Sequence, residues 1–351
     1  MTHLITADRE YLASYLKPRP NERKVGQQVK LVDNANLSDS LKDLQQSGAK
    51  FVLLGIPEDI GPRANLGKGG ADLGWHAFLN NFVNLQHNEF IKSDELILLG
   101  HIECDDLQRH SQTLDLSDQQ GLAALRMLVE QLDKRVSDVI ELIGQSQLIP
   151  IVIGGGHNNA LPILQGMSKA QNQPLAVVNL DPHTDFRLLE GRHSGNGFSY
   201  AAKQQVMSHY FSLGMHELKN SSKNLASLKQ YDFPFVSFQQ IVNYREFSFE
   251  QAITQATDYL DASEQPIGIE LDLDCISYMP ASAYTNAGFS LSDAQYYIHR
   301  IAQLKRSCYL HLAEGAPCQH PAGLEAGMSD IGQGLANLVC SFIQTKQRAT
   351  F

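Results

Sequence analysis

The chain has 351 residues, of which 43% are hydrophobic and 19% are charged, a composition typical of a globular protein with a buried core. Its formal net charge of -10 and the absence of a basic stripe argue against a nucleic-acid partner. No segment approaches the roughly 18 consecutive apolar residues of a membrane helix, and the N-terminus lacks the apolar stretch of a signal peptide. Five cysteines without CxxC spacing are typical of free thiols in a reducing compartment. We therefore expect a cytoplasmic protein without a membrane partner.

Two regions are expected along the chain: a polar N-terminal extension over residues 1–45, packed on the main domain, and a single α/β domain over residues 46–351. Within the domain, short apolar runs alternate with longer amphipathic stretches. The apolar runs predict strands in FVLLGI (51–56), LIPIVIGGGHNNA (148–160), LAVVNLDPHTDF (175–186), IGIELDLDC (267–275) and CYLHLAEGAP (308–317). Apolar residues at helical spacing predict helices over 119–146 and near 248–261, 292–304 and 330–346.

The alternation of strand, loop and helix predicts a mainly parallel sheet with helices on both faces. In sheets of this kind, ligands bind beyond the carboxyl ends of the strands. We see no repeat, linker or low-complexity segment that would divide the domain. The residues of chemical interest are therefore those that follow the predicted strands.

The segment Asp181-Pro182-His183-Thr184-Asp185 ends one of these apolar runs. In an extended chain, alternate side chains point to the same side. Two carboxylates and an imidazole would then converge at one strand end.

Asp272 and Asp274 share one face of the 267–275 strand, and Glu270 lies one step back on the same face. Two acids beside apolar neighbours repel each other and lose solvation. A divalent cation would offset both costs. His157 ends another run, after three glycines that allow a tight turn and close backbone approach.

These segments supply two imidazoles and four carboxylates: His157, Asp181, His183, Asp185, Asp272 and Asp274. A zinc site takes about three or four ligands, usually with more nitrogen or sulfur, whereas a set rich in oxygen suits Mn²⁺. The number of ligands suits two ions that share carboxylates and lie about 3.5–4 Å apart. Each motif alone has an ordinary structural explanation, as a loop histidine or a pair of surface acids. All three together, each ending an apolar run, favour a metal site.

The motifs resemble those of the ureohydrolase (arginase-like) superfamily, which comprises arginases, agmatinases and formiminoglutamases (formimidoylglutamases). The family pattern is matched by GGGH (154–157), DPHTD (181–185), DLD (272–274), HLAEGAP (311–317) and the glycine-rich GPRANLGKGGA (61–71). The resemblance spans roughly residues 50–320. It implies a three-layer α/β/α sandwich around a mainly parallel sheet, two Mn²⁺ ions per subunit at the strand ends, and a homo-oligomer.

The resemblance also implies how the ligands are shared. One ion would bind His157, Asp181, Asp185 and Asp272. The other would bind Asp181, His183, Asp272 and Asp274, so that Asp181 and Asp272 bridge the pair. A hydroxide between the ions would attack the amidine carbon of the substrate, and Asp185 could also orient that hydroxide.

Two further residues have catalytic roles by the same resemblance. Glu314 matches the late glutamate of the family and would hold the cationic amidine or guanidine through charge-assisted hydrogen bonds. His193, in the RHSGNGF loop after the metal motif, is the candidate that protonates the leaving amine. A loop histidine bonded to backbone is the alternative for His193.

Within the superfamily, GGGH resembles formiminoglutamases, whereas arginases and agmatinases usually carry GGDH. Arg187 and the SGxxF loop at 194–198, which includes Asn196, point the same way. Because an arginine binds carboxylates bidentately, Arg187 suits the two carboxylates of formiminoglutamate; a structural ion pair is its alternative. We therefore predict hydrolysis of N-formimino-L-glutamate to glutamate and formamide, a step of histidine catabolism, with Arg187, Asn196 and Glu314 binding the substrate.

The chain also departs from the family pattern. Glu270 stands where a small or hydroxyl residue is usual, and CISYMPASAYTNAGFS (275–290) replaces a stretch that shapes the family's substrate pocket. The alternatives are an arginase- or agmatinase-type enzyme that releases urea, a deacetylase of the histone-deacetylase type, and a non-catalytic relative that binds a metabolite or a protein. The deacetylase type uses one Zn²⁺ and lacks the full ligand set, and a non-catalytic relative would have lost ligands.

Overall fold

One nine-stranded sheet runs through the part of the chain that this computed structural model describes, residues 3–32 and 36–348. The strand order is β1-β3-β2-β4-β9-β8-β5-β6-β7. The pairing of β1 with β3 is antiparallel, and the other pairs are parallel. The strands are β1 (Leu4–Thr6), β2 (Phe51–Gly55), β3 (Leu96–Ile102), β4 (Ile149–Ile153), β5 (Leu175–Leu180), β6 (Met207–Met215), β7 (Phe235–Ser237), β8 (Ile267–Asp272) and β9 (Ser307–Ala313).

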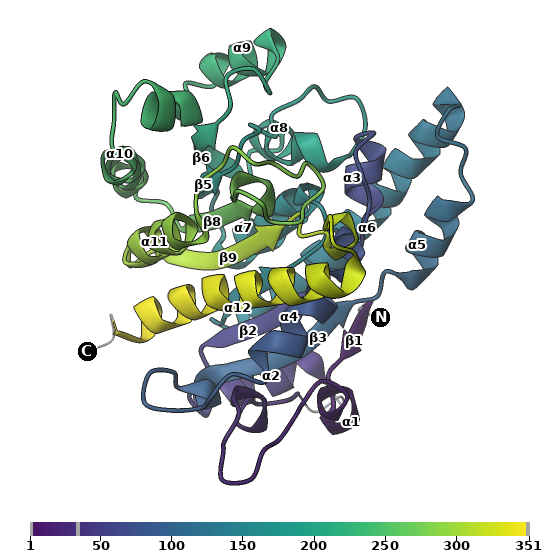
Figure 1. Cartoon of the computed structure of the whole chain (residues 1–351), viewed down its shortest axis with the longest axis vertical. Coiled ribbons are helices and arrows are strands. Elements are labelled where there is room, and N and C mark those ends of the chain that lie inside the picture. The colour runs from purple at the N-terminus through teal and green to yellow at the C-terminus, as the bar shows by residue number, and fades with distance from the viewer. Residues whose placement is uncertain (1–2, 33–35, 349–351) are drawn as a thin grey trace.

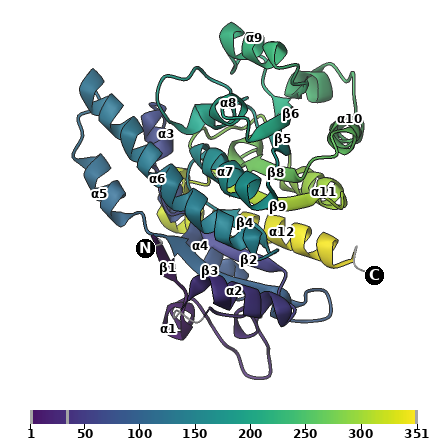
Figure 2. The same ribbon diagram turned by 180° about the vertical axis from the view of Figure 1, so that it is seen from behind.

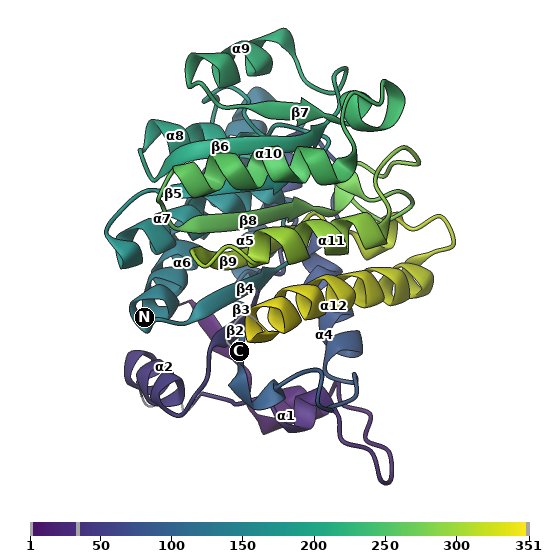
Figure 3. The same cartoon turned by 90° about the vertical axis from the view of Figure 1, so that its left-hand side faces the viewer.

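Helices cover both faces of the sheet (Figures 1 and 2). Along one face lie α4 (Gly74–Phe82), α10 (Phe249–Ala262), α11 (Leu291–Ala302) and α12 (Leu324–Arg348). Along the other lie α2 (Leu37–Gln46), α6 (Gln119–Gln145), α7 (Ala160–Gln171) and α8 (Gly197–Lys203). Figure 3 shows α10, α11 and α12 in front of the sheet and α6 and α7 behind it. Further helices lie in the connections: α1 (Arg9–Ala13), α3 (Ile60–Ala64), α5 (Asp105–Gln112) and α9 (Ser222–Gln230).

The two faces of the sheet bury separate hydrophobic clusters. In β2, Phe51 and Leu53 contact the cluster under α4 and α12, whereas Val52 and Leu54 contact the cluster under α6. A strand buried on both faces appears in sequence as a continuous apolar run, as FVLLG does. The three-layer α/β/α architecture is therefore confirmed. Among the described residues, none of the helices combines the length and the apolar character needed to cross a membrane.

The apolar runs predicted as strands correspond to β2, β4, β5, β8 and β9, although the strand ends differ from the prediction. β8 stops at Asp272 and is followed by a short 3₁₀ helix (Leu273–Cys275), and β9 stops at Ala313. The sequence prediction missed β1, β3, β6 and β7. β1 and β7 each have three residues, too few for a periodic pattern, and β6 begins with a polar, partly exposed segment.

The predicted helices are present as α6, α10, α11 and α12. α12 begins at Leu324, before the predicted start at 330. The prediction missed its first turns because they are polar and contain Gly327, so that they show no apolar spacing. The predicted extension, residues 1–45, contributes to the sheet through β1, which pairs with β3. Residues 1–2 and 33–35 of this extension lie outside the described residues.

Four adjacent strands at the centre of the sheet, β4, β9, β8 and β5, position the candidate site. β4 and β5 are consecutive in the sequence but are separated in the sheet by β9 and β8, which come from the end of the chain. Such a reversal of strand order is where open α/β sheets bind ligands, at the carboxyl ends of the strands. The segments that follow these four strands therefore meet at one edge.

Candidate metal centre

The six predicted ligands gather where β4, β5 and β8 end. We define the inner group as His157, Asp181, Asp185 and Asp272, whose donor atoms all lie within 4.8 Å of one another. We define the outer group as Asp181, His183, Asp272 and Asp274. Asp181 and Asp272 belong to both groups, as the resemblance implied for bridging ligands.

The inner group surrounds one nitrogen of a buried imidazole. His157 Nδ1 lies 3.2 Å from Asp181 Oδ2, 3.0 Å from Asp185 Oδ2 and 3.4 Å from Asp272 Oδ2. This nitrogen is buried and has no hydrogen-bond partner. Three carboxylates around an unpartnered imidazole nitrogen form the donor set of a divalent cation. The residues therefore fit a metal ion at this position.

The outer group opens on a cavity. His183 Nδ1 lies 3.4 Å from Asp181 Oδ1 and 3.7 Å from Asp274 Oδ2. The His183, Asp272 and Asp274 donor atoms lie within 4.8 Å of one another. Asp181 thus turns one carboxylate oxygen toward each imidazole, as a carboxylate that bridges two ions would.

Turns, not an extended strand, bring these residues together. β5 ends at Leu180, so the DPHTD segment lies beyond the strand. Asp181 Oδ1 accepts a hydrogen bond from His183 N at 2.6 Å, and Asp185 has a φ of +44°. Asp272 Oδ1 likewise accepts from Asp274 N at 2.7 Å, at the start of the short 3₁₀ helix. The predicted geometry of alternating side chains was wrong, although the same residues converge.

Burial of several acids in one place perturbs their ionisation. Burial, and then the neighbouring carboxylates, hold the pKa of Asp272 well above its usual range. Burial also raises the pKa of Asp274 to about 6. Crowded acids in a poorly solvated site resist ionising together, and a bound cation reverses that effect. The electrostatics of the cluster therefore favour a cation as strongly as its geometry does.

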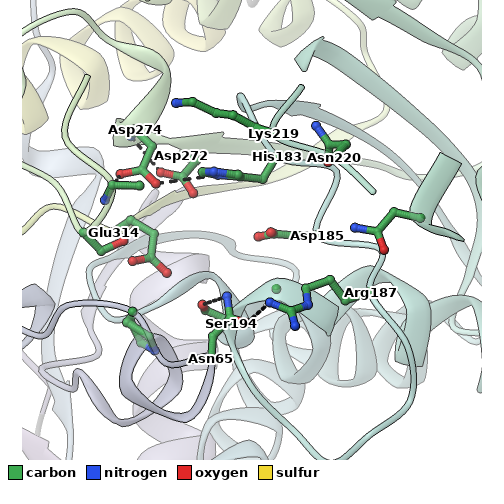
Figure 4. A pocket seen from close by; sticks show the side chains of 16 residues that line it. Asn65, His183, Asp185, Arg187, Ser194, Lys219, Asn220, Asp272, Asp274 and Glu314 are labelled. Carbon is green, nitrogen blue, oxygen red and sulfur yellow. Dashed lines mark hydrogen bonds and ion pairs between the residues drawn. The ribbon is translucent and has the colours of Figure 1, made fainter. Parts of the chain in front are cut away.

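Glu314 directs a carboxylate oxygen into the same cavity. Its backbone N–H donates to Gly155 O at 2.9 Å, and its Oε1 accepts from His157 N at 2.8 Å. Its Oε2 is buried and has no hydrogen-bond partner. Its φ is +66°, and burial, followed by the charge of Asp274, raises its pKa to about 8. Glu314 thus leaves one acceptor free beside the two donor groups (Figure 4).

The cavity has a volume of about 220 Å³ and combines acids with cationic and amide side chains. Arg187 lines it, donates to Asn65 Oδ1 at 2.7 Å and also forms the alternative ion pair, with Glu190 at 3.3 Å. Lys219 and Asn220 also line it, and the sequence analysis missed both. They follow β6, a strand that the sequence prediction did not include. Asn65 lies within the glycine-rich segment 61–71 of the family pattern, but the sequence predicted no role for its side chain.

His193 and Asn196 do not line this cavity, contrary to their predicted contact with substrate. The His193 ring is buried, accepts from Gly195 N at 3.1 Å and lies 3.2 Å from Glu190. Burial, followed by the charge of Arg187, lowers its pKa to about 3. This placement matches the alternative of a loop histidine bonded to backbone.

The side chain of Asn196 forms hydrogen bonds within its own loop. Its Oδ1 accepts from Arg192 Nη1 at 2.7 Å, and its Nδ2 donates to Gly191 O at 2.8 Å. Arg192 is buried and forms an ion pair of 2.7 Å with Asp133 of α6. A buried guanidinium needs partners for its remaining N–H groups, and Asn196 is one of them. The side chain is thereby held away from the cavity.

Glu58 is a buried residue of the site that the sequence analysis did not identify. It accepts hydrogen bonds from Gly61 N at 3.0 Å, Gly156 N at 2.7 Å and Asn159 Nδ2 at 2.7 Å. These bonds join the loop after β2 to the loop that presents His157. Its position two residues after the apolar run FVLLGI was the available signal.

Comparison with known proteins places these motifs in a family context. The model of the arginase family matches residues 49–330. A curated relative, the formimidoylglutamase of Streptococcus gordonii, is 25% identical over 330 residues, which cover 89% of this chain and 88% of the relative. Another, the formimidoylglutamase of Streptococcus pyogenes serotype M12, is 28% identical over 233 residues, which cover 61% of this chain and 65% of the relative.

Solved structures resemble the chain over nearly its whole length. The formimidoylglutamase from Bacillus subtilis has a TM-score of 0.75 and 14% identity, covering 97% of this chain and 96% of its own. The formiminoglutamase of Trypanosoma cruzi with Mn²⁺ has a TM-score of 0.68 and 17% identity, covering 92% of this chain and 99% of its own. At these identities the resemblance shows the shared fold.

Proposed function

Because the chain belongs to the arginase family, we propose that it is a metal-dependent hydrolase of a linear amidine whose substrate is N-formimino-L-glutamate. Water cleaves the C–N bond to the amino acid nitrogen, and the products are glutamate and formamide. The curated relatives that carry the name formimidoylglutamase support this choice of substrate.

The observation that carries the proposal is the pair of donor groups that share Asp181 and Asp272. The inner group would hold one Mn²⁺ ion and the outer group a second, since both sets are rich in the oxygen donors that suit this metal. When bound, such a pair of ions lowers the pKa of water and supplies a nucleophile at neutral pH. A deacetylase-type site with one Zn²⁺ would not need the outer group, and a non-catalytic relative would not need either group complete.

The remaining side chains of the cavity suit the charges of the substrate. Glu314 Oε2, buried and unpartnered, would accept charge-assisted hydrogen bonds from the amidinium. Arg187 and Lys219 line the same cavity and would attract the two carboxylates of the glutamate moiety. A substrate with one cationic and two anionic groups thus finds a partner for each charge.

Asp185 is the residue best placed to move protons. It lines the cavity and lies 3.0 Å from His157 Nδ1. Its place between the inner group and the cavity supports this role, because it reaches both the metal position and the space for water and substrate. We assign to it the orientation of the attacking water and the transfer of a proton to the leaving nitrogen. His193, predicted for that transfer, lies outside the cavity lining.

A product assay tests the proposal. Mn²⁺-loaded protein is offered formiminoglutamate, arginine, agmatine and guanidinobutyrate in parallel. We expect glutamate and formamide from the first and no urea from the other three. Urea from any guanidine compound would move the assignment to an arginase- or agmatinase-type enzyme. If a protein that holds two ions released no product from any of the four compounds, the substrate assignment would be overturned.

Two predictions about the wider context belong with this proposal. The family resemblance predicts a homo-oligomer, and the composition predicts a cytoplasmic location. Light scattering coupled to size-exclusion chromatography measures the first, and fractionation of the source cells measures the second.

A further inference from the structure

Glu270 is a buried carboxylate at the centre of the sheet, and the proposed chemistry leaves it without a role. It lies on β8, between β9 and β5, and its side chain has no exposed surface. In the sheet it is paired with His311 of β9. A buried carboxylate is stable only where donors surround it, so its partners indicate what it does.

Three side chains donate to Glu270. Tyr309 donates its hydroxyl to Oε1 at 2.7 Å. On the other oxygen, Oε2 lies 2.6 Å from His311 Nδ1 and 3.2 Å from His157 Nε2. Among the described residues, the ion-pair contacts of Glu270 are with these two histidines. The carboxylate therefore lies directly behind the imidazole of the inner group.

This contact decides which nitrogen of His157 is free. A neutral imidazole carries one N–H, and the nitrogen without hydrogen is the one that can bind a metal. If Nε2–H donates to Glu270, the lone pair of Nδ1 faces the three carboxylates of the inner group. That is the nitrogen found buried and without a hydrogen-bond partner.

We propose that Glu270 is a positioning residue that fixes the tautomer and the ring orientation of His157, and that His311 and Tyr309 hold Glu270 in place for this purpose. The inference rests on the proposed function, because it takes His157 as a ligand of the inner ion. Carboxylates that accept the second N–H of a ligating histidine are a general means of orienting the ligand and raising its basicity.

His311 supports this arrangement. Its Nε2 is buried and has no hydrogen-bond partner, so the contact of its Nδ1 with Glu270 is the hydrogen bond that the structure gives its ring. The rings of His157 and His311 lie 5.7 Å apart at an angle of 63°. Both imidazoles thus approach the same carboxylate oxygen, His311 from β9 and His157 from the segment after β4.

The same three residues have a competing interpretation. Donor atoms of His157, Glu270 and His311 lie within 4.8 Å of one another and could themselves hold an ion. In that case Glu270 would be a ligand rather than a positioning residue. Counting the bound ions separates the two interpretations.

The experiment measures Mn²⁺ binding and its paramagnetic resonance spectrum in apo protein of the wild type, Glu270→Gln and Tyr309→Phe. We expect two ions in the wild type, with the spectrum of a coupled pair. In Glu270→Gln, one of the two ions should bind about 10- to 100-fold more weakly, and a single-ion spectrum should replace that of the pair. Tyr309→Phe is the matched control, since it removes a donor only from Oε1, the oxygen that does not contact His157; its loss should be smaller.

The thermal unfolding of the apo proteins is measured in parallel, because Glu270 is buried. Glu270→Asp, which keeps the charge but withdraws the oxygens, replaces Glu270→Gln if that variant does not fold; it should also weaken one ion. Unchanged Mn²⁺ affinity and an unchanged pair spectrum in either variant, beside a two-ion wild type, would overturn the inference and leave the proposed function standing. A third ion in the wild type, lost in the variant, would also overturn it, since Glu270 would then be a ligand. A wild type that does not bind two ions would overturn the proposed function itself.

Discussion

The inner and outer donor groups share two carboxylates but lie in different surroundings. The His157 side chain has no exposed surface, whereas 29% of the His183 side chain is exposed. Behind His157 stands Glu270, itself held by two further side chains. His183 instead lines the cavity.

This difference shows how one metal centre can meet two demands. Ligands within the core are held by packing and by hydrogen bonds, so their geometry is fixed before a metal arrives. Ligands on the cavity side leave room for water and substrate. The predictions below test whether the two groups differ in this way.

The largest effect is expected at the two carboxylates that the inner and outer groups share, because a change there affects both groups. Asp272→Ala should lose both ions and lower kcat/KM on the order of 10³-fold or more, because the water nucleophile is no longer available at neutral pH. Metal content and the product assay measure the two losses. In addition, Mn²⁺ should raise the Tm of the wild type, by mass action on the folded state, but not that of the variant. A fully metallated, active Asp272→Ala protein would rule out the two-ion centre.

The next effect separates the two histidines. His157→Asn and His183→Asn should each lose one ion. His157→Asn should also destabilise the apo protein by about 1–3 kcal/mol, because the buried Glu270 loses a donor. His183→Asn should change the stability of the apo protein much less, because the partly exposed ring lines the cavity. Denaturant unfolding of both apo variants measures the difference. Equal destabilisation would show that the inner group is no more a part of the core than the outer one.

A smaller effect is expected from the cationic side of the cavity. Arg187→Ala should raise KM for formiminoglutamate by about tenfold, the equivalent of about 1.4 kcal/mol, for the loss of a charged hydrogen bond, with two ions still bound. Lys219→Ala removes the other cationic side chain of the cavity, and its KM is compared with that of Arg187→Ala. Steady-state kinetics and metal analysis give the two readouts. Loss of metal in Arg187→Ala would mean that this residue supports the outer group instead of binding substrate.

The smallest effect comes from an ion pair that belongs to neither group. Arg135 donates to Asp106 at 2.6 Å, and this hydrogen bond lowers the pKa of Asp106 to about 2. Because the folded pKa lies below the unfolded value of about 3.9, the pair stabilises the fold above pH 4 or so and loses that contribution as the pH falls toward 2. After screening by solvent, Arg135→Ala should cost about 0.5 kcal/mol at neutral pH. Unfolding experiments at several pH values should show the difference vanish in acid, and at neutral pH the Mn²⁺ content of the variant should equal that of the wild type.

The sequence was informative where residue type alone decides the outcome. The apolar run FVLLGI predicted a strand, and the spacing of acids and imidazoles predicted the six ligands, whose division into two groups came from the family resemblance. Conformation beyond the strands was less accessible. The DPHTD segment reads as extended, but the hydrogen bond from His183 N to Asp181 and the positive φ of Asp185 form turns instead.

Roles that depend on tertiary partners could not be predicted. Asn196 lies in a motif that suggested substrate binding, but the buried pair of Arg192 and Asp133 takes up its side chain. Glu270 lies behind His157 because β9 lies between β8, which carries Glu270, and β4, which leads to His157; no single segment of sequence encodes this order of strands. Lys219 was missed because β6, which leads to it, was not predicted.

The backbone at Asp185 and Glu314 has a consequence for any attempt to make the protein more heat-resistant. Both residues have left-handed φ values, +44° and +66°, a conformation that glycine adopts freely and that costs other residues about 1–3 kcal/mol. Glycine at either position would relax this strain, and at Asp185 it would also remove a crowded negative charge. An engineer who ranked substitutions by stability alone would therefore include these two among the residues with left-handed φ, although the gain in stability there would end catalysis.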